Sequence, residues 1–261
     1  MRACIAACAA LMLPTAAMAR DLCTERPGLG TPACTVEPGR VQIETGVADW
    51  TRERDSGTRI DTVTIAATEM RIGVAHATEL QLSWTPYGYE RMRDAAGSVE
   101  RSNGTGDIRI GLKQNLANPD GHGFAAAVLP FATLPAGRQP IGAGDWGAGL
   151  IVPLTYDVSD AIQFELTSEV DAAVDADGQG RHLAYGHVVG VEWDPVQSVE
   201  ITAEVQAMRD RDPSGHATQW LAGLSAAWQP ATQLQFDLGT ALGLDHDAPG
   251  LRVYGGFVTR F

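Results

Sequence analysis

The most constraining feature of this 261-residue sequence is a repeated alternation of apolar and polar residues with a period of two. Residues 199–205 read VEITAEV and residues 234–238 read LQFDL. Such alternation indicates a β-strand with one apolar and one polar face. No segment shows the helical period together with capping residues. We therefore predict an all-β fold.

Turn signals divide the sequence after residue 40 into twelve such runs. They lie at 41–51, 59–74, 79–91, 104–115, 122–134, 145–157, 161–173, 181–194, 198–209, 216–229, 233–244 and 250–261. The connections alternate between short turns, as at 75–78, and longer charged loops, as at 92–103. This alternation is typical of outer-membrane barrels. The prediction is a transmembrane antiparallel β-barrel of about 12 strands, with short periplasmic turns and longer extracellular loops.

Aromatic residues are spaced as the two interfaces of a membrane require. Trp220 and Trp228 share one strand face, and Trp146 and Tyr156 bracket another apolar run. Eight residues at ~3.3 Å each, tilted by about 40°, cover roughly 20 Å, close to the separation of two aromatic girdles. A soluble β-sandwich would instead bury its aromatic residues. The terminal Phe261 resembles the signal read by the barrel-assembly machinery, so we expect that machinery and outer-membrane lipid as partners.

The N-terminus predicts secretion. Arg2 precedes an apolar run over residues 4–14, and small residues follow at Ala17 and Ala19. These parts in this order indicate a signal peptide over residues 1–19, cleaved near Ala19. Together with the barrel prediction, this places the protein in the outer membrane of a Gram-negative cell.

Residues 20–40 are expected to form a periplasmic N-terminal segment, and residues 41–261 the barrel. After cleavage two cysteines remain, Cys23 and Cys34, in an oxidising compartment. A disulfide between them is predicted, closing a Pro- and Gly-rich loop near the lower rim of the barrel.

Composition and motifs exclude several functions. The net charge is −13, which argues against nucleic-acid binding, because phosphate neutralisation needs clustered Lys and Arg. Past the first 20 residues no apolar stretch is long enough for a transmembrane helix. Residues 142–147 satisfy GxGxxG, but a strand follows where a helix is required. We expect no enzymatic activity, no cofactor and no metal, and we interpret the histidines in turns as solvated.

One enzymatic alternative is a hydrolase embedded in the membrane, which would need a Ser and a His exposed together on the lipid face. His187 has the outward parity of its strand, but Ser225 points inward. No other Ser pairs with His187 in an evident way, so we interpret His187 as a neutral residue at a packing or subunit contact.

Many charged residues stand at the strand positions that are predicted to face the inside of the barrel. One wall is predicted to be acidic, with Glu165, Glu169, Asp171, Glu192, Glu200, Glu204 and Asp237. The facing wall is mixed to basic, with Arg71, Arg109, Lys113, Arg252 and Arg260 among Glu44, Glu69, Glu79 and Asp107. Tyr87 and Tyr89 are expected inward near the outer mouth, where they would stack a planar solute. Opposed charges across a water-filled passage would set its selectivity.

The same charges would also suit a filled structural barrel without a transport pathway, in which they pair with one another. A barrel of twelve strands is intermediate in size between small barrels, whose interiors are filled by side chains, and large porins, which enclose an open channel. Inward glycines, such as Gly46, Gly111 and Gly223, leave room, so we favour the passage.

Several segments resemble a known family. Residues 106–113 (GDIRIGLK) resemble the G-D-x-x-x-G-x-K signature of the transporter-like family labelled "MetA-pathway of phenol degradation". Residues 71–80, 131–137 and 144–147 resemble its neighbouring segments, and residues 26–44 its N-terminal part. The resemblance implies an outer-membrane channel for small solutes, aromatic or hydrophobic compounds among them. It implies no enzymatic activity.

Overall fold

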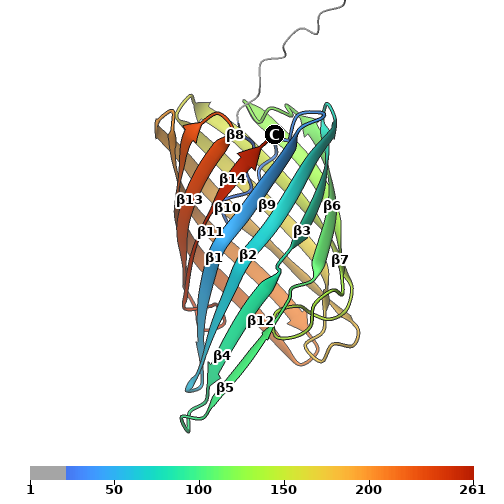
Figure 1. Cartoon of the computed structure of the whole chain (residues 1–261), viewed down its shortest axis with the longest axis vertical. Coiled ribbons are helices and arrows are strands. Elements are labelled where there is room, and N and C mark those ends of the chain that lie inside the picture. The colour runs from blue at the N-terminus through green and yellow to red at the C-terminus, as the bar shows by residue number, and fades with distance from the viewer. Residues whose placement is uncertain (1–21) are drawn as a thin grey trace, which may run out of the picture.

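The alternating runs are β-strands in the computed structural model, which describes residues 22–261 (Figure 1). The predicted signal peptide lies outside the described residues. The strands are β1 (Val41–Asp55), β2 (Thr58–Ala75), β3 (Thr78–Trp84), β4 (Tyr87–Arg93), β5 (Val99–Gly104), β6 (Ile108–Ala117), β7 (Phe124–Leu134), β8 (Gly147–Ser159), β9 (Ile162–Val174), β10 (Arg181–Val196), β11 (Val199–Asp212), β12 (Gly215–Ala231), β13 (Leu234–Gly243) and β14 (Leu251–Arg260).

These strands form one closed antiparallel sheet. β1 pairs with both β14 and β2, which closes the barrel. β3 and β4 pair with successive parts of β2 and act as a single strand broken at Thr85 and Pro86. β6 and β5 pair with β3 and β4 in the same way. Twelve strands therefore run around the barrel, as predicted.

The break between β3 and β4 changes which side chains face inward. Pro86 has no backbone N–H for the sheet, and the neighbouring Ala66 of β2 has φ 58°. Beyond the break, the residues that face the lumen on β1, β2 and β4 are the directly paired Asp49, Thr64 and Gly88. Tyr87 and Tyr89 consequently face outward beside Ile65 and Val63, so the expectation that they line the mouth is wrong.

The barrel exposes its apolar residues and buries its polar ones. Trp146, Tyr156, Trp220 and Trp228 are each about half exposed on the outer surface. Arg71, Lys113 and Glu79, by contrast, are completely buried within the barrel. This inversion fits a hydrocarbon surround. No helix within residues 22–261 is long and apolar enough to cross a membrane.

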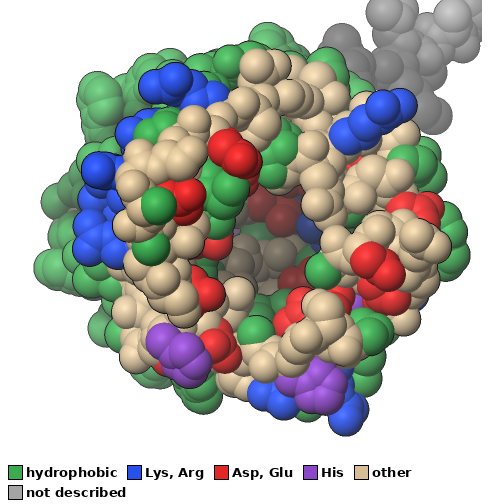
Figure 2. Space-filling model, turned by 90° about the horizontal axis from the view of Figure 1, so that it is seen from below, with side chains coloured by type: hydrophobic (Ala, Val, Ile, Leu, Met, Phe, Trp, Pro, Cys, Tyr) green, Lys and Arg blue, Asp and Glu red, His purple; other side chains and the backbone are tan. Residues whose placement is uncertain are grey.

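The two ends of the barrel differ. The short turns and the C-terminus lie at the upper end in Figure 1, while the longer connections and the projecting β4–β5 hairpin lie at the lower end. Seen from that lower end, the barrel is hollowed, with acidic side chains around and within the opening (Figure 2). The long-loop end therefore leads into the lumen.

Candidate functional site

A stretch without regular secondary structure, residues 22–40, lies inside the barrel. We call it the lumen segment. It contacts inward side chains such as Glu204 of β11 and Tyr254 of β14. The sequence predicted this stretch outside the barrel at the periplasmic rim, where the short turns lie. The structure instead places it within the lumen, in the half nearer the short turns. It has no period-two pattern, so sequence periodicity gave no sign of where it would dock.

Inward acidic and hydroxyl side chains accept the backbone N–H groups of the lumen segment. Glu44 accepts from Glu25 and Arg26, at 2.9 to 3.1 Å. Glu204 accepts from Leu29 and Gly30, at 2.7 to 2.8 Å. Glu79 accepts from Val36 at 2.7 Å, and Thr167 from Thr31 at 2.9 Å. These side chains therefore replace the sheet partners that a strand would have.

The carbonyl groups of the segment are satisfied in the same way. Cys23 O accepts from Gln42 and Arg71, and Pro27 O accepts from the Tyr254 hydroxyl. Ala33 O accepts from Asn115 at 2.8 Å. The segment is thus bound by side chains of many strands rather than by one.

Ion pairs strengthen this attachment. Lys113 Nζ lies 2.6 Å from Glu25, and Arg26 lies 2.8 Å from Asp237. Arg71 lies 3.0 Å from Glu44 and 2.8 Å from Glu79. Arg71, Lys113 and Asp237, expected to border a passage, instead hold the segment. Breaking a buried pair of this kind costs about 3–5 kcal/mol.

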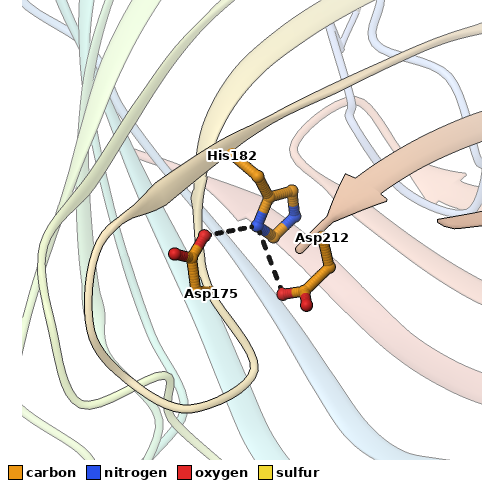
Figure 3. A group of neighbouring side chains, drawn as sticks. All are labelled: Asp175, His182 and Asp212. Carbon is orange, nitrogen blue, oxygen red and sulfur yellow. Dashed lines mark hydrogen bonds and ion pairs between the residues drawn. The ribbon is translucent and has the colours of Figure 1, made fainter. Parts of the chain in front are cut away.

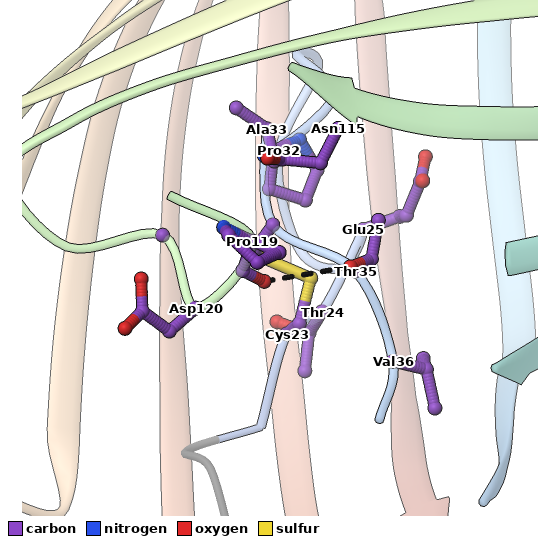
Figure 4. The surroundings of a disulfide bond; sticks show 12 residues. Cys23, Thr24, Glu25, Pro32, Ala33, Thr35, Val36, Asn115, Pro119 and Asp120 are labelled. Carbon is purple, nitrogen blue, oxygen red and sulfur yellow. Dashed lines mark hydrogen bonds between the residues drawn. A yellow bond between two sulfur atoms is a disulfide. The ribbon is translucent and has the colours of Figure 1, made fainter. Parts of the chain in front are cut away.

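The predicted disulfide is present between Cys23 and Cys34 (Figure 4). It closes the lumen segment on itself, and Cys23 is only 6% exposed. Close by, the Thr35 N–H donates to Pro119 O at 3.0 Å, in the connection between β6 and β7. The bridge therefore fixes the shape of the segment next to the barrel wall.

The inward glycines make room for the segment and for large inward side chains. A side chain at Gly46 or Gly256 would meet Arg26, and one at Gly223 would meet Leu29. A side chain at Gly239 would meet the Tyr254 ring. The room beside these glycines is thus filled by the lumen segment and by Tyr254.

The acidic wall, defined as Glu165, Glu169, Glu192, Glu200 and Glu204 on β9 to β11, keeps its predicted place. Both carboxylate oxygens of Glu204 accept hydrogen bonds from the lumen segment. Glu165, Glu192 and Glu200 line a narrow gap, whose other side is formed by segment residues that include Gly28, Gly30 and Pro32. A cavity of about 720 Å³ adjoins this gap at the short-turn end, with Glu200 in its lining. The acidic wall therefore borders the narrowest part of the lumen beside the segment.

A second cavity lies beside the segment, on the side of β2 and β3. It measures about 260 Å³, and its lining includes Glu25, Arg26, Glu69 and Asp107. Arg109 is inward but stacks on the Phe131 ring at 3.7 Å from its centroid. Asp171 and Phe131 both lie against Gly149. Arg109 thus belongs to a cluster on β6 to β9 rather than to the attachment of the segment.

Asp107, in the GDIRIGLK run of residues 106–113, organises a loop over the long-loop mouth. Its Oδ1 accepts the N–H groups of Ala136 and Gly137, at 3.1 and 2.9 Å. Its Oδ2 accepts those of Ala143 and Gly144, at 2.6 and 3.3 Å. One carboxylate thus closes both ends of the loop over residues 135–144.

The same loop continues to Asp145 and Trp146. The Trp146 backbone N–H and the Arg181 guanidinium lower the pKa of the Asp145 carboxyl. Arg181 also stacks on the Trp146 ring at 4.3 Å from its centroid. These contacts join the loop to the start of β10.

A Ser and a His do meet on the outer face. Ser168 Oγ lies 2.9 Å from His187 Nδ1, on paired positions of β9 and β10. Sequence reasoning missed this pair because the cross-strand register was unknown. Across the sheet, Ser168 is paired on its other side with Val152 of β8, and His187 with Ala207 of β11. Neither of these side chains has a carboxylate or amide to orient the imidazole.

The other residues singled out from the sequence lie inside the barrel or at its C-terminal edge. Ser225 is buried and inward, as expected. Arg252 pairs with Asp49 inside the barrel, and Arg260 lies 3.3 Å from Glu37. Phe261 is exposed, and its backbone pairs with Val41 at the edge of β1.

The chain matches one family model and resembles solved barrel structures. The model of the family described as "Putative MetA-pathway of phenol degradation" matches residues 24–261. No curated protein sequence matches the chain significantly. Among solved structures, the NanC porin is similar with TM-score 0.51 and 8% identity, over 84% of this chain and 98% of that chain. The "CymD monoaromatic hydrocarbon channel" gives TM-score 0.46 and 10% identity, over 87% and 89%.

Proposed function

The chain belongs to the family described as "Putative MetA-pathway of phenol degradation", and we propose that it forms an outer-membrane channel for small organic solutes, aromatic compounds among them. The single observation that carries this proposal is the hollow long-loop mouth, which leads to a lumen with cavities on two sides of an inserted segment. A barrel filled for stability alone would have no use for these spaces. The solute class rests on the family description.

The passage runs along the acidic wall. On that side the lumen segment leaves Glu192 and Glu200 bordering the cavities, and neither accepts a hydrogen bond from the segment. On the opposite side Arg71 and Lys113 tie the segment down. A solute therefore meets carboxylates of the barrel on one side and the segment on the other. Ions passing this gap would be mainly cations.

Single-channel recording in planar bilayers tests the proposal. The oxidised, folded protein should give discrete conductance steps with a cation preference. A variant that lacks residues 22–38 should give larger steps, because the segment narrows the lumen. Bilayers that stay silent with correctly folded wild-type protein, while the deletion variant conducts, would contradict the channel and favour the filled structural barrel.

The filled barrel is the alternative because many buried contacts hold the segment in place. It predicts no flux of small aromatic solutes into liposomes at any pH or voltage. We also propose that the protein is not an enzyme, since the Ser168–His187 pair has only apolar neighbours along its row. The outer membrane, its lipid and the barrel-assembly machinery complete the proposal as location and partners.

A further inference from the structure

A histidine at the long-loop end of the barrel lies beside three aspartates. Figure 3 shows His182 with two of them, Asp175 and Asp212. His182 begins β10, Asp175 follows β9, and Asp210 and Asp212 end β11. His182 falls within the predicted strand 181–194, and its sequence gave no sign of a special role. Its side chain is only 6% exposed, unlike the solvated histidines expected in turns.

Both ring nitrogens face carboxylates. Nδ1 lies 2.9 Å from Asp175 Oδ1 and 3.4 Å from Asp212 Oδ2. Nε2 lies 3.0 Å from Asp210 Oδ1, without the alignment of a hydrogen bond. A nearly buried imidazole with carboxylates at both nitrogens has the arrangement found where one nitrogen binds a metal and a carboxylate holds the other.

The charge balance points to a cation. Among residues 22–261, no Lys or Arg side chain forms an ion pair with Asp175, Asp210 or Asp212, whose ion pairs all go to His182. Protonation of the imidazole would offset one of the three negative charges. A divalent cation bound to the neutral imidazole would offset two.

The spacing of the atoms fits a metal. Nδ1 and the two carboxylate oxygens of Asp175 and Asp212 all lie within 4.8 Å of one another. Ligand atoms about 2.1 Å from one metal are about 3.0–3.4 Å apart, in octahedral or tetrahedral geometry. Both measured separations from Nδ1 lie at or close to this range.

We propose that Asp175, His182 and Asp212 bind a divalent transition metal of the Zn²⁺ type. An imidazole nitrogen with two carboxylates suits Zn²⁺, whereas Ca²⁺ and Mg²⁺ prefer oxygen ligands alone. Asp210 would act on the far side of the ring, as the carboxylate that orients a metal-binding imidazole through its other nitrogen.

The site would join two connections of the mouth. Asp212 already accepts the Ala176 N–H at 2.7 Å and the Ser214 N–H at 2.7 Å. Ala176 O in turn accepts from Gln139 Nε2 at 3.3 Å, in the loop that Asp107 closes. A metal at this point would therefore stiffen the rim formed by the β9–β10 connection and the loop over residues 135–144.

The experiment is isothermal titration of chelator-treated, folded protein in detergent with ZnCl₂ at pH 7. We expect one equivalent of Zn²⁺ to bind, with millimolar CaCl₂ and MgCl₂ unable to displace it. His182→Ala should weaken binding at least 100-fold. Asp210→Asn should weaken it about 10- to 100-fold, the range found when a carboxylate behind a metal-binding histidine is removed.

The matched control is His246→Ala, because His246 is another loop histidine beside an aspartate, with a side chain 92% exposed. Its binding should equal that of the wild type. Heat-modifiable migration in gels verifies the fold of every variant. Absence of Zn²⁺ binding by folded wild-type protein, binding that survives His182→Ala, or an equal loss in His246→Ala would each overturn the proposal.

Discussion

Removing the Glu204 carboxylate should release the lumen segment. This carboxylate accepts the backbone N–H groups of Leu29 and Gly30 in three short hydrogen bonds. In Glu204→Ala both N–H groups lose their acceptor inside the barrel. An unsatisfied buried donor costs about 1–3 kcal/mol, so the docked state should lose roughly 2–6 kcal/mol. Since about 1.4 kcal/mol is a factor of ten, the released population should rise at least ~30-fold.

Limited digestion with a glutamate-specific protease measures that population. Glu25 is held by Lys113 in the docked state, so cleavage after it requires release. When reclosing is faster than cleavage, the cleavage rate follows the released population. Mass spectrometry after reduction of the disulfide reads the loss of the N-terminal peptide. The rate in Glu204→Ala should exceed that of the wild type by at least ~30-fold.

Glu200→Ala is the matched control. Glu200 lies on the same strand and the same wall and carries the same charge, but it accepts a hydrogen bond from Thr202 rather than from the segment. Its cleavage rate should stay within about threefold of the wild type. Equal acceleration in both variants would refute the reasoning, because the effect would then come from lost charge and not from lost acceptors.

Four further predictions follow from the same contacts. Arg71→Gln should lower the free energy of unfolding by about 3–5 kcal/mol in urea titrations followed by Trp fluorescence, since Glu44 loses its ion pair and Glu79 loses the nearer of its two cations; Arg40→Gln, at an exposed site, should change it by less than about 0.5 kcal/mol. Glu192→Gln with Glu200→Gln should reduce the cation preference in reversal-potential measurements, while Glu100→Gln on the exposed hairpin should not; unchanged selectivity would exclude a path along the acidic wall. Asp107→Ala should open the loop over residues 135–144 to protease, whereas full protection would show that its four N–H groups have other acceptors. Cys23→Ser should leave barrel assembly and heat-modifiability intact and destabilise the segment by up to ~3 kcal/mol; failure of the barrel to form would mean that the bridge is needed for closure.

The sequence predicted the barrel well because alternation is a local signal. Runs such as β11 and β13 carry both their strand character and their inward face in their own residues. The same reasoning fails where parity changes inside a strand. Ala66 has φ 58° without any residue preference for it, although Pro86 was a visible warning. Tyr87 and Tyr89 were therefore assigned to the wrong face.

The candidate site was harder to predict because it depends on partners far apart in the chain. The inward position of Arg71, Lys113 and Glu204 followed from parity, but their partner did not. A Pro- and Gly-rich segment without periodicity gives no register. The Ser168–His187 pair and the surroundings of His182 likewise depend on cross-strand register and loop geometry, which one sequence does not provide.

The attachment of the lumen segment has a consequence for assembly. Its partners come from β1, β2, β3, β6, β9, β11, β13 and β14, so they stand together only after the wall has closed. A strand that slipped by one residue would turn its whole inward row to the lipid and present an apolar side chain where the segment needs a carboxylate. The lumen segment would then fail to dock. Docking of the segment therefore stabilises the one closed barrel in which every strand is in register.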